Sequence, residues 1–243
     1  MNKRSIPSID EINRRCKSLC NYKTKKIIYE DDNYGFSDGN NKTGKCGKCY
    51  DKILIWNMPC VKTCPGASDW CMRYCYNAAY NNMYEWEGNF RKYSSDSGGL
   101  RRELTDQLKE LCSSKSIAVR LHSSGDFFSN NYIDFWIKIM KETPNIRYWS
   151  YTRSWRVEEL SDKIAELHSI PNLSLYYSWD NTMGCPKNKA KLAIVCNNNL
   201  EVNSYSNQKE YIICPEQYNL VNSCAECGSC IGGDGRSVVF IAH

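Results

Sequence analysis

The sequence contains no apolar run long enough to cross a lipid bilayer, and its first residues carry charges without an apolar stretch behind them. We therefore expect neither a membrane span nor an export signal, and we expect the protein to act in the cytoplasm. Internal repeats and low-complexity linkers are also absent from the sequence, which argues against a repeat architecture. The 42% of hydrophobic residues, with 12% aromatic residues, indicates a globular chain.

Fifteen cysteines in 243 residues are the most unusual feature that is present. A reducing cytoplasm does not keep structural disulfides, and an odd number of cysteines cannot pair completely. Ligation of metal by thiolates is the explanation that remains. The net charge of +5 is mild and adds only weak support for an anionic partner, such as nucleic acid or a phosphorylated cofactor.

Apolar runs alternate with amphipathic segments through the middle of the chain. Strands are expected at 53–56, 117–121, 146–151, 173–179, 192–196 and 237–242, with a further apolar patch at 211–213. Helices are expected at 8–19, 69–84, 100–111, 132–140 and 157–167. Such alternation favours parallel strand pairing with right-handed crossovers. We predict an α/β fold, a partial, open parallel β/α barrel with cysteine-rich N- and C-terminal extensions.

Cysteine-rich segments flank the predicted barrel and divide the chain into three parts. Residues 1–50 form an N-terminal arm, residues 51–200 the barrel core, and residues 201–243 a C-terminal segment. A chain of this length is too short for two full enzymatic domains.

The segment PCVKTCPGASDWCMRYCYN places four cysteines in one loop directly after the strand at 53–56. They are Cys60, Cys64, Cys71 and Cys75. Pro65 and Gly66 supply a bend, so the loop can wrap an iron-sulfur cluster. A zinc site and a set of buried free cysteines are the alternatives.

The C-terminal segment contains two overlapping CxxC units, a spacing that is typical of ferredoxin-like ligand runs. We expect a second cluster here, held by Cys214, Cys224, Cys227 and Cys230, with Cys185 and Cys196 as further candidates. In the N-terminal arm, a zinc clip or a third cluster is open to Cys16, Cys20, Cys46 and Cys49. Cys112 ends a helix face and is most simply a core residue.

The strand, the cysteine loop and the later alternation together resemble the radical S-adenosylmethionine superfamily. The nearest resemblance is to small phage-associated members with a TCPG segment followed by a CY step, here Thr63–Gly66 and Cys75–Tyr76. The segments VRLHSSGDFF and IRYWSYTRSW extend the resemblance, which covers about residues 56–196. The C-terminal cysteines resemble the auxiliary-cluster regions that many of these enzymes carry.

The resemblance implies a four-iron four-sulfur cluster that three cysteines hold, so that one iron stays open for S-adenosylmethionine. One electron from a flavodoxin- or ferredoxin-type donor then cleaves the sulfonium to a deoxyadenosyl radical. The usual CxxxCxxC spacing is missing, and the expected ligands are Cys64, Cys71 and Cys75. If Cys60 were a fourth ligand, it would close the open iron.

Polar residues at the carboxyl ends of the predicted strands are the candidates for binding S-adenosylmethionine, because parallel barrels place their active sites there. They are Ser123, Ser124, Gly125 and Asp126 for the methionine ammonium, Thr152, Arg153 and Ser154 for the carboxylate, and Ser178 and Asp180 for the ribose. The segment SSGD is alternatively an ordinary turn before a helix, and Arg153 a surface charge. His122 is most simply a hydrogen-bonded strand-end residue, and the aromatic residues of the later strands are mainly core.

We therefore expect a redox enzyme of the radical S-adenosylmethionine type, whose substrate the sequence does not name. The alternatives are a non-catalytic or electron-transfer cluster protein with all four loop cysteines as ligands, and a zinc-bound module that binds nucleic acid.

Overall fold

The computed structural model describes residues 34–47, 50–75, 77, 83–186 and 190–242. Its described residues form one sheet with the strand order β1-β2-β3-β4-β5-β6-β8-β7. The strands are β1 (Ser37–Asp38), β2 (Lys52–Trp56), β3 (Ile117–Leu121), β4 (Arg147–Thr152), β5 (Leu173–Asp180), β6 (Leu192–Cys196), β7 (Tyr211–Ile213) and β8 (Ser237–Ile241). Among the strands that the structure describes, the β1–β2 pair alone is antiparallel. The predicted α/β class with a mainly parallel sheet is confirmed.

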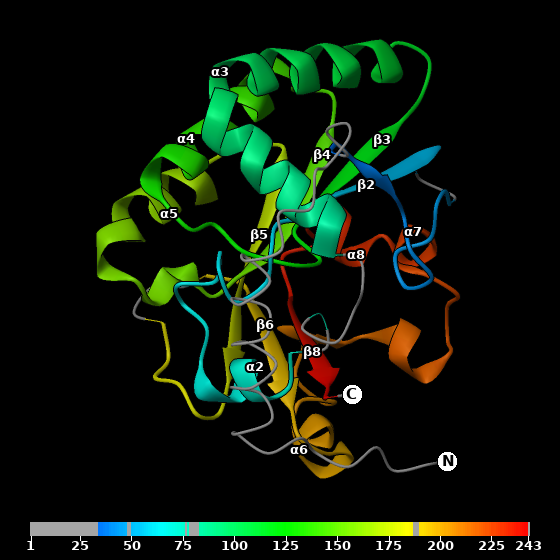
Figure 1. Ribbon diagram of the computed structural model, residues 1–243. Helices are drawn as coiled ribbons and strands as arrows, with labels where there is room; N and C mark the ends of the chain where they lie inside the picture. The colour runs from blue at the N-terminus through cyan, green and yellow to red at the C-terminus, as the bar shows by residue number, and fades with distance from the viewer. Residues whose placement is uncertain (1–33, 48–49, 76, 78–82, 187–189, 243) are drawn as a thin grey trace.

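Helices cover the two faces of the sheet unequally (Figure 1). The long helices α3, α4 and α5 lie together on one face, whereas the short helices α7 and α8 lie on the other. The bounds are α2 Asp69–Arg73, α3 Met83–Cys112, α4 Asn130–Glu142, α5 Ser161–His168, α6 Asn199–Asn203, α7 Cys224–Cys227 and α8 Ser229–Gly232, with 3₁₀ turns η3 Ser154–Arg156, η4 Glu158–Leu160 and η5 Pro215–Tyr218.

The two-residue period of the strands explains which side chains meet the long helices. In β3, Val119 and Leu121 enter the large apolar core beneath α3, α4 and α5, while Arg120 faces the other way and lines a cavity. Helix α4 contributes a stripe of buried residues to the same core, among them Tyr132 and Trp136. The side chains on the opposite face of the sheet, which the long helices do not cover, line the cavity.

Two expectations about helices are wrong in detail. Helix α2 ends at Arg73 instead of continuing to residue 84, since the next residue, Tyr74, leaves helical geometry (φ −104°, ψ 15°). Beyond it, Asn77 donates to the Ser123 carbonyl oxygen at the end of β3. Helix α3 begins at Met83 instead of Leu100, with a kink at Asp96 whose carboxylate accepts the Gly99 N–H at 2.8 Å. The helix predicted at 8–19 lies outside the described residues.

The predicted arm and C-terminal segment both contribute to the central sheet. β1 comes from the arm, and β7 and β8 come from the C-terminal segment, where β8 pairs with β6. The apolar patch at 211–213 is the strand β7. Among the helices that the structure describes, none has the length and apolar character of a membrane span.

Candidate metal and cofactor site

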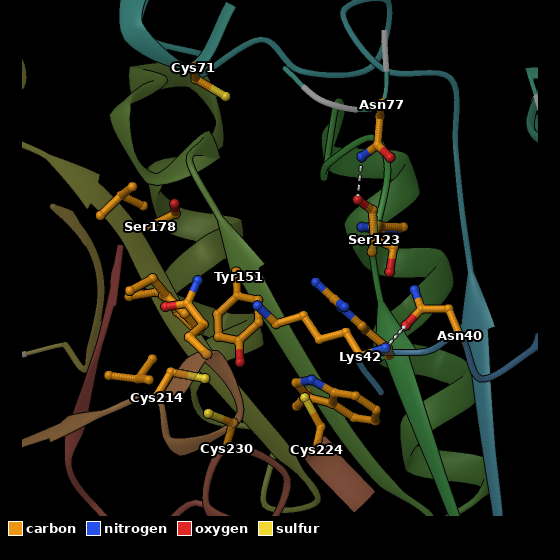
Figure 2. Close-up of a pocket in the computed structure, with 18 of the residues that line it drawn as sticks. Asn40, Lys42, Cys71, Asn77, Ser123, Tyr151, Ser178, Cys214, Cys224 and Cys230 are labelled. Carbon is orange, nitrogen blue, oxygen red and sulfur yellow. Dashed lines mark hydrogen bonds between the residues drawn. The ribbon is translucent and has the colours of Figure 1, made fainter. Parts of the chain in front are cut away.

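A cavity of about 1610 Å³ opens on the face of the sheet opposite α3, α4 and α5. Its wall includes inward-facing strand residues such as Arg120, Trp149, Tyr151 and Ser178. Cysteines from both predicted groups also line it: Cys64, Cys71, Cys75, Cys214, Cys224, Cys227 and Cys230. Figure 2 shows Cys71 on one side of the Tyr151 ring and the C-terminal cysteines on the other. The fold therefore brings two distant parts of the chain to one cavity.

The central cysteines lie on the loop that leaves β2. The Ser68 hydroxyl caps α2 and accepts the Cys71 N–H at 3.1 Å, which fixes Cys71 at the start of that helix. Cys60 differs from the other three, because it is 6% exposed and stands outside the cavity lining. Its hydrogen bond to the Cys75 sulfur, together with burial, raises the pKa of the Cys60 thiol.

Burial also raises the pKa of two cavity-facing thiols of this loop, those of Cys64 and Cys71. Burial and the neighbouring Asp126 carboxylate raise the pKa of Cys64. For Cys71, burial raises the pKa to about 11, although the Arg153 charge opposes this change. Such thiols stay protonated near neutral pH, and a metal would have to displace their protons to bind them. Sulfur donors are the ligands that a thiophilic metal takes.

Glycines seat the cysteine loop directly on the ends of β3 and β4. A Cβ on Gly66 would lie 2.0 Å from the Arg153 carbonyl oxygen. A Cβ on Gly125, whose φ is +81°, would lie 2.6 Å from both Met58 Cβ and Thr63 Oγ1. Gly125 therefore permits a close backbone approach, as the sequence indicates, but to the cysteine loop.

The backbone of the SSGD turn is bonded to residues of the same loop. Asn57 Oδ1 accepts the N–H groups of Ser123 and Ser124 at 2.8 and 2.9 Å. Asn77 donates to the Ser123 carbonyl oxygen at 2.6 Å, as Figure 2 shows. Ser123 and Gly125 line the cavity, whereas the Ser124 side chain is buried beneath it.

Asp126 joins the ends of β3 and β4. It is 5% exposed and accepts hydrogen bonds from Thr152 Oγ1 at 2.6 Å and the Arg153 N–H at 2.8 Å. Burial raises the pKa of this carboxyl, and the hydrogen bonds oppose the rise. The predicted candidates Asp126 and Thr152 are thus partners of each other, and Thr152 is fully buried.

Arg153 and Asp180 form a buried ion pair at the strand ends. The guanidinium is held by Asp180 Oδ2 and by Ser68 Oγ, the latter at 3.2 Å. Arg153 lines the cavity and is only 7% exposed, so it is not a surface charge. Burial opposes ionisation of Asp180, but hydrogen bonds from Thr182 and Ser68 and the Arg153 charge outweigh it and lower its pKa.

The C-terminal cysteines converge at the other end of the cavity. In Figure 2 the sulfurs of Cys214, Cys224 and Cys230 point toward one another, with the Tyr151 hydroxyl directed at them. Burial raises the pKa of Cys230 to about 12, and the hydrogen bond that Tyr151 donates to it opposes this rise. Burial raises the pKa of Cys224 to about 11 against the opposing charge of Arg120.

Comparison with known families covers most of this site. The family model described as Gene product 88 matches residues 34–233, which include both cysteine groups. The chain belongs to the Gene product 88 family. The Gene 88 protein of Mycobacterium phage L5 is 26% identical over 206 residues, covering 73% of this chain and 81% of the relative. The Gene 88 protein of Mycobacterium phage D29 is 26% identical over 207 residues with the same coverage. No solved structure matches the chain.

The remaining cysteines of this Gene product 88 family member lie apart from the cavity or outside the described residues. Cys196 packs against Val202 and Val239 on the outer face of the sheet, which is the face turned away from the cavity. Cys185 and Cys46 are exposed, and Cys112 packs against the main core as the sequence predicts. Cys16, Cys20 and Cys49 lie outside the described residues. Within the part of the chain that the structure describes, no three Cys, His, Asp or Glu side chains are arranged to hold a single metal ion.

Sequence reasoning missed several residues that build the site. Arg120 is a charged residue within an apolar strand, and that contrast was the signal for a polar cavity. Asn57 and Asn77 carry no comparable signal, because their role depends on which backbone groups the fold brings near them.

His122 is buried with its Nε2 at 2.8 Å from the Tyr132 hydroxyl. Burial and the Arg120 charge lower its pKa to about 3, so it is neutral.

Proposed function

We propose that this protein is an iron-sulfur redox enzyme of the radical S-adenosylmethionine type that acts in the cytoplasm. One observation carries the proposal: three cysteines of one loop line a large cavity at the carboxyl ends of parallel strands, while the fourth is set behind them. On this proposal the sheet is the wall of an open β/α barrel of that type. Active sites of such barrels lie at this edge.

Cys64, Cys71 and Cys75, which line the cavity, would hold a four-iron four-sulfur cluster, and three cysteine ligands would leave one iron without a cysteine. When bound, the cluster and S-adenosylmethionine supply one-electron reductive cleavage of a sulfonium carbon–sulfur bond. The chain contributes three partly buried thiols at the cavity wall, together with a loop seated on the strand ends through Gly66 and Gly125.

Arg153 is the best-placed residue for a carboxylate of the bound cofactor. The ion pair with Asp180 fixes its guanidinium at the cavity wall, and its charge acts on the nearby Cys71 thiol. Arginine can donate two parallel hydrogen bonds to a carboxylate. Ser123 and Ser178 also line the cavity and can meet other polar groups of the cofactor. Asp126 and Thr152 position the ends of β3 and β4 instead.

The proposed chemistry needs an external one-electron donor, for which a flavodoxin- or ferredoxin-type protein is suited. The cavity is large enough for a cofactor and a further molecule beside it. The second molecule would be the substrate.

The test is to incubate anaerobically purified, reduced protein with S-adenosylmethionine and to measure 5′-deoxyadenosine and methionine. We expect both products from the wild type and from the outer-face control Cys196→Ala. The Cys64→Ala, Cys71→Ala and Cys75→Ala variants should form neither, because each removes a cluster ligand. Absence of both products from iron-loaded wild type would overturn the proposal.

A second function is favoured by the hydrogen bond between the Cys60 and Cys75 sulfurs. If Cys60 is a fourth ligand, the central cluster has no open iron, and the protein is an electron-transfer or structural cluster protein. Cys60→Ala decides between the two. The enzyme retains its central iron and its cleavage activity in this variant, whereas a four-cysteine centre loses iron.

A further inference from the structure

The spacing of the C-terminal cysteines differs from that of a usual zinc clip. Cys224, Cys227 and Cys230 are separated by two residues each, whereas structural zinc sites commonly pair two separate CxxC units. Runs of CxxCxxC with a remote Cys-Pro step are the ligand pattern of four-iron four-sulfur ferredoxins. Here the remote step is Cys214–Pro215, at the end of β7.

The local backbone directs these thiols to one side. Gly228, with φ +71°, ends α7 and starts α8, so the chain turns between Cys227 and Cys230. All four cysteines of the group line the cavity. Figure 2 shows the sulfurs of Cys214, Cys224 and Cys230 facing a common space, although the described residues, as they stand, form no group of three that could hold a single metal ion.

Hydrogen bonds from two sides fix the short helices α7 and α8 in place. The N–H groups of Cys224 and Ala225 donate to the carbonyl oxygens of Lys42 and Thr43, each at 2.9 Å. On the other side, Ser174 donates to the Ile231 carbonyl oxygen at 3.1 Å and Arg147 to that of Gly232 at 3.0 Å. The cysteine segment is thus preorganised by β4, β5 and the 40–47 segment.

Positive charge and one hydroxyl surround the thiols. Arg120 acts on Cys224, and Lys42 acts on Cys214 and Cys224, while Lys42 also pairs with Glu216 at 3.5 Å. The Arg120 guanidinium lies 5.7 Å from the centre of the Tyr151 ring. Figure 2 shows the Tyr151 hydroxyl directed at the C-terminal cysteines, within reach of the Cys230 thiol, whose pKa it lowers. Four thiolates around an iron-sulfur core carry net negative charge, which these groups offset.

We propose that Cys214, Cys224, Cys227 and Cys230 hold a second four-iron four-sulfur cluster at the opposite end of the same cavity, and that Tyr151 tunes its reduction potential through the Cys230 sulfur. This site is independent of the proposed function. It requires no S-adenosylmethionine chemistry and no iron at the central loop.

The test uses full-length protein purified anaerobically, with iron, acid-labile sulfide and zinc measured per chain. We expect the Cys64→Ala/Cys71→Ala/Cys75→Ala variant to retain about four irons and four sulfides. The single variants Cys224→Ala and Cys227→Ala change fewer residues than the triple central variant, and each should contain about four irons fewer than the wild type. The control Cys196→Ala should contain as much iron as the wild type. Loss of all iron from the central variant, with circular dichroism showing that it is folded, would overturn the site, as would zinc in place of iron.

Tyr151→Phe tests the tuning role separately from folding. Hydrogen bonds to cluster sulfurs raise the reduction potential, so this variant should keep its iron while the midpoint potential of the second cluster becomes more negative. Tyr205→Phe, the same change on the outer face beside Tyr211, should leave the potential unchanged. An unaltered potential in Tyr151→Phe overturns the assigned role of this residue. Failure of S-adenosylmethionine cleavage with an intact second cluster would count against the proposed function alone.

Discussion

At the residue scale, the pairing of Arg153 with Asp180 fixes a positive charge beside the central cysteines. Both side chains are buried, and a buried charge that loses its partner is strongly unfavourable. Sequence analysis identified both residues from their positions after predicted strands. It did not identify the pair, because two residues separated by a helix and a strand become neighbours only in the folded sheet.

Asp180→Asn removes one charge of this pair and leaves Arg153 buried without its counter-ion. We expect the free energy of unfolding at neutral pH to fall by about 3 kcal/mol. Urea unfolding followed by circular dichroism measures it. Asp134→Asn is the control: Asp134 pairs with Lys163 at 2.7 Å on the surface, and its loss should cost about 0.5 kcal/mol or less.

The same pair makes stability depend on pH. Because the folded state lowers the pKa of Asp180, its contribution is complete above the ordinary aspartate pKa of about 3.9 and is lost as the pH falls through the lower folded value. The difference between wild type and Asp180→Asn should therefore shrink in acid. A difference that stays constant down to the acid transition would contradict the ion-pair interpretation.

At the scale of elements, the turn between β3 and α4 and the cysteine loop after β2 form one packed unit. Their contact depends on Gly125, where a side chain would overlap Met58 and Thr63. The sequence predicted the strand, the turn and the loop separately. It could not predict that the turn's close approach is to the loop, since that contact depends on the register of β2 against β3.

Gly125→Ala tests this unit. A positive φ and a steric overlap together should lower the free energy of unfolding by about 3 kcal/mol, and the central iron should be lost as the loop shifts. Gly235→Ala is a matched control, since Gly235 has φ +88° with open space around it and should cost about 1 kcal/mol. Equal effects of the two substitutions on stability and on iron would show that the turn does not support the loop.

The helices show where periodicity succeeds and fails. The apolar spacing of the segment at 132–140 predicted α4, whose buried stripe faces the core. The same approach extended α2 too far, because periodicity does not register contacts with distant residues, such as the bond from Asn77 to the Ser123 carbonyl oxygen just beyond this helix. The leucine spacing of 100–111 predicted only the second half of α3, which lies beyond the kink at Asp96.

At the scale of the whole molecule, one sheet joins three segments of the chain around one cavity. The alternation of strands and helices predicted the parallel core from β2 to β6. The insertion of β8 between β6 and β7 was not predictable, because it depends on pairing between strands that are distant in sequence. The C-terminal cysteines, which precede β8, line the same cavity as the central loop (Figure 2).

The metal content of the whole molecule is the most direct measurement, since both cysteine groups are interpreted as iron-sulfur ligands. Protein purified without oxygen and analysed for iron, acid-labile sulfide and zinc should contain about eight irons and eight sulfides per chain, with a brown colour that oxygen bleaches. Stoichiometric zinc without sulfide, or folded protein that takes up neither metal, would contradict the central claim.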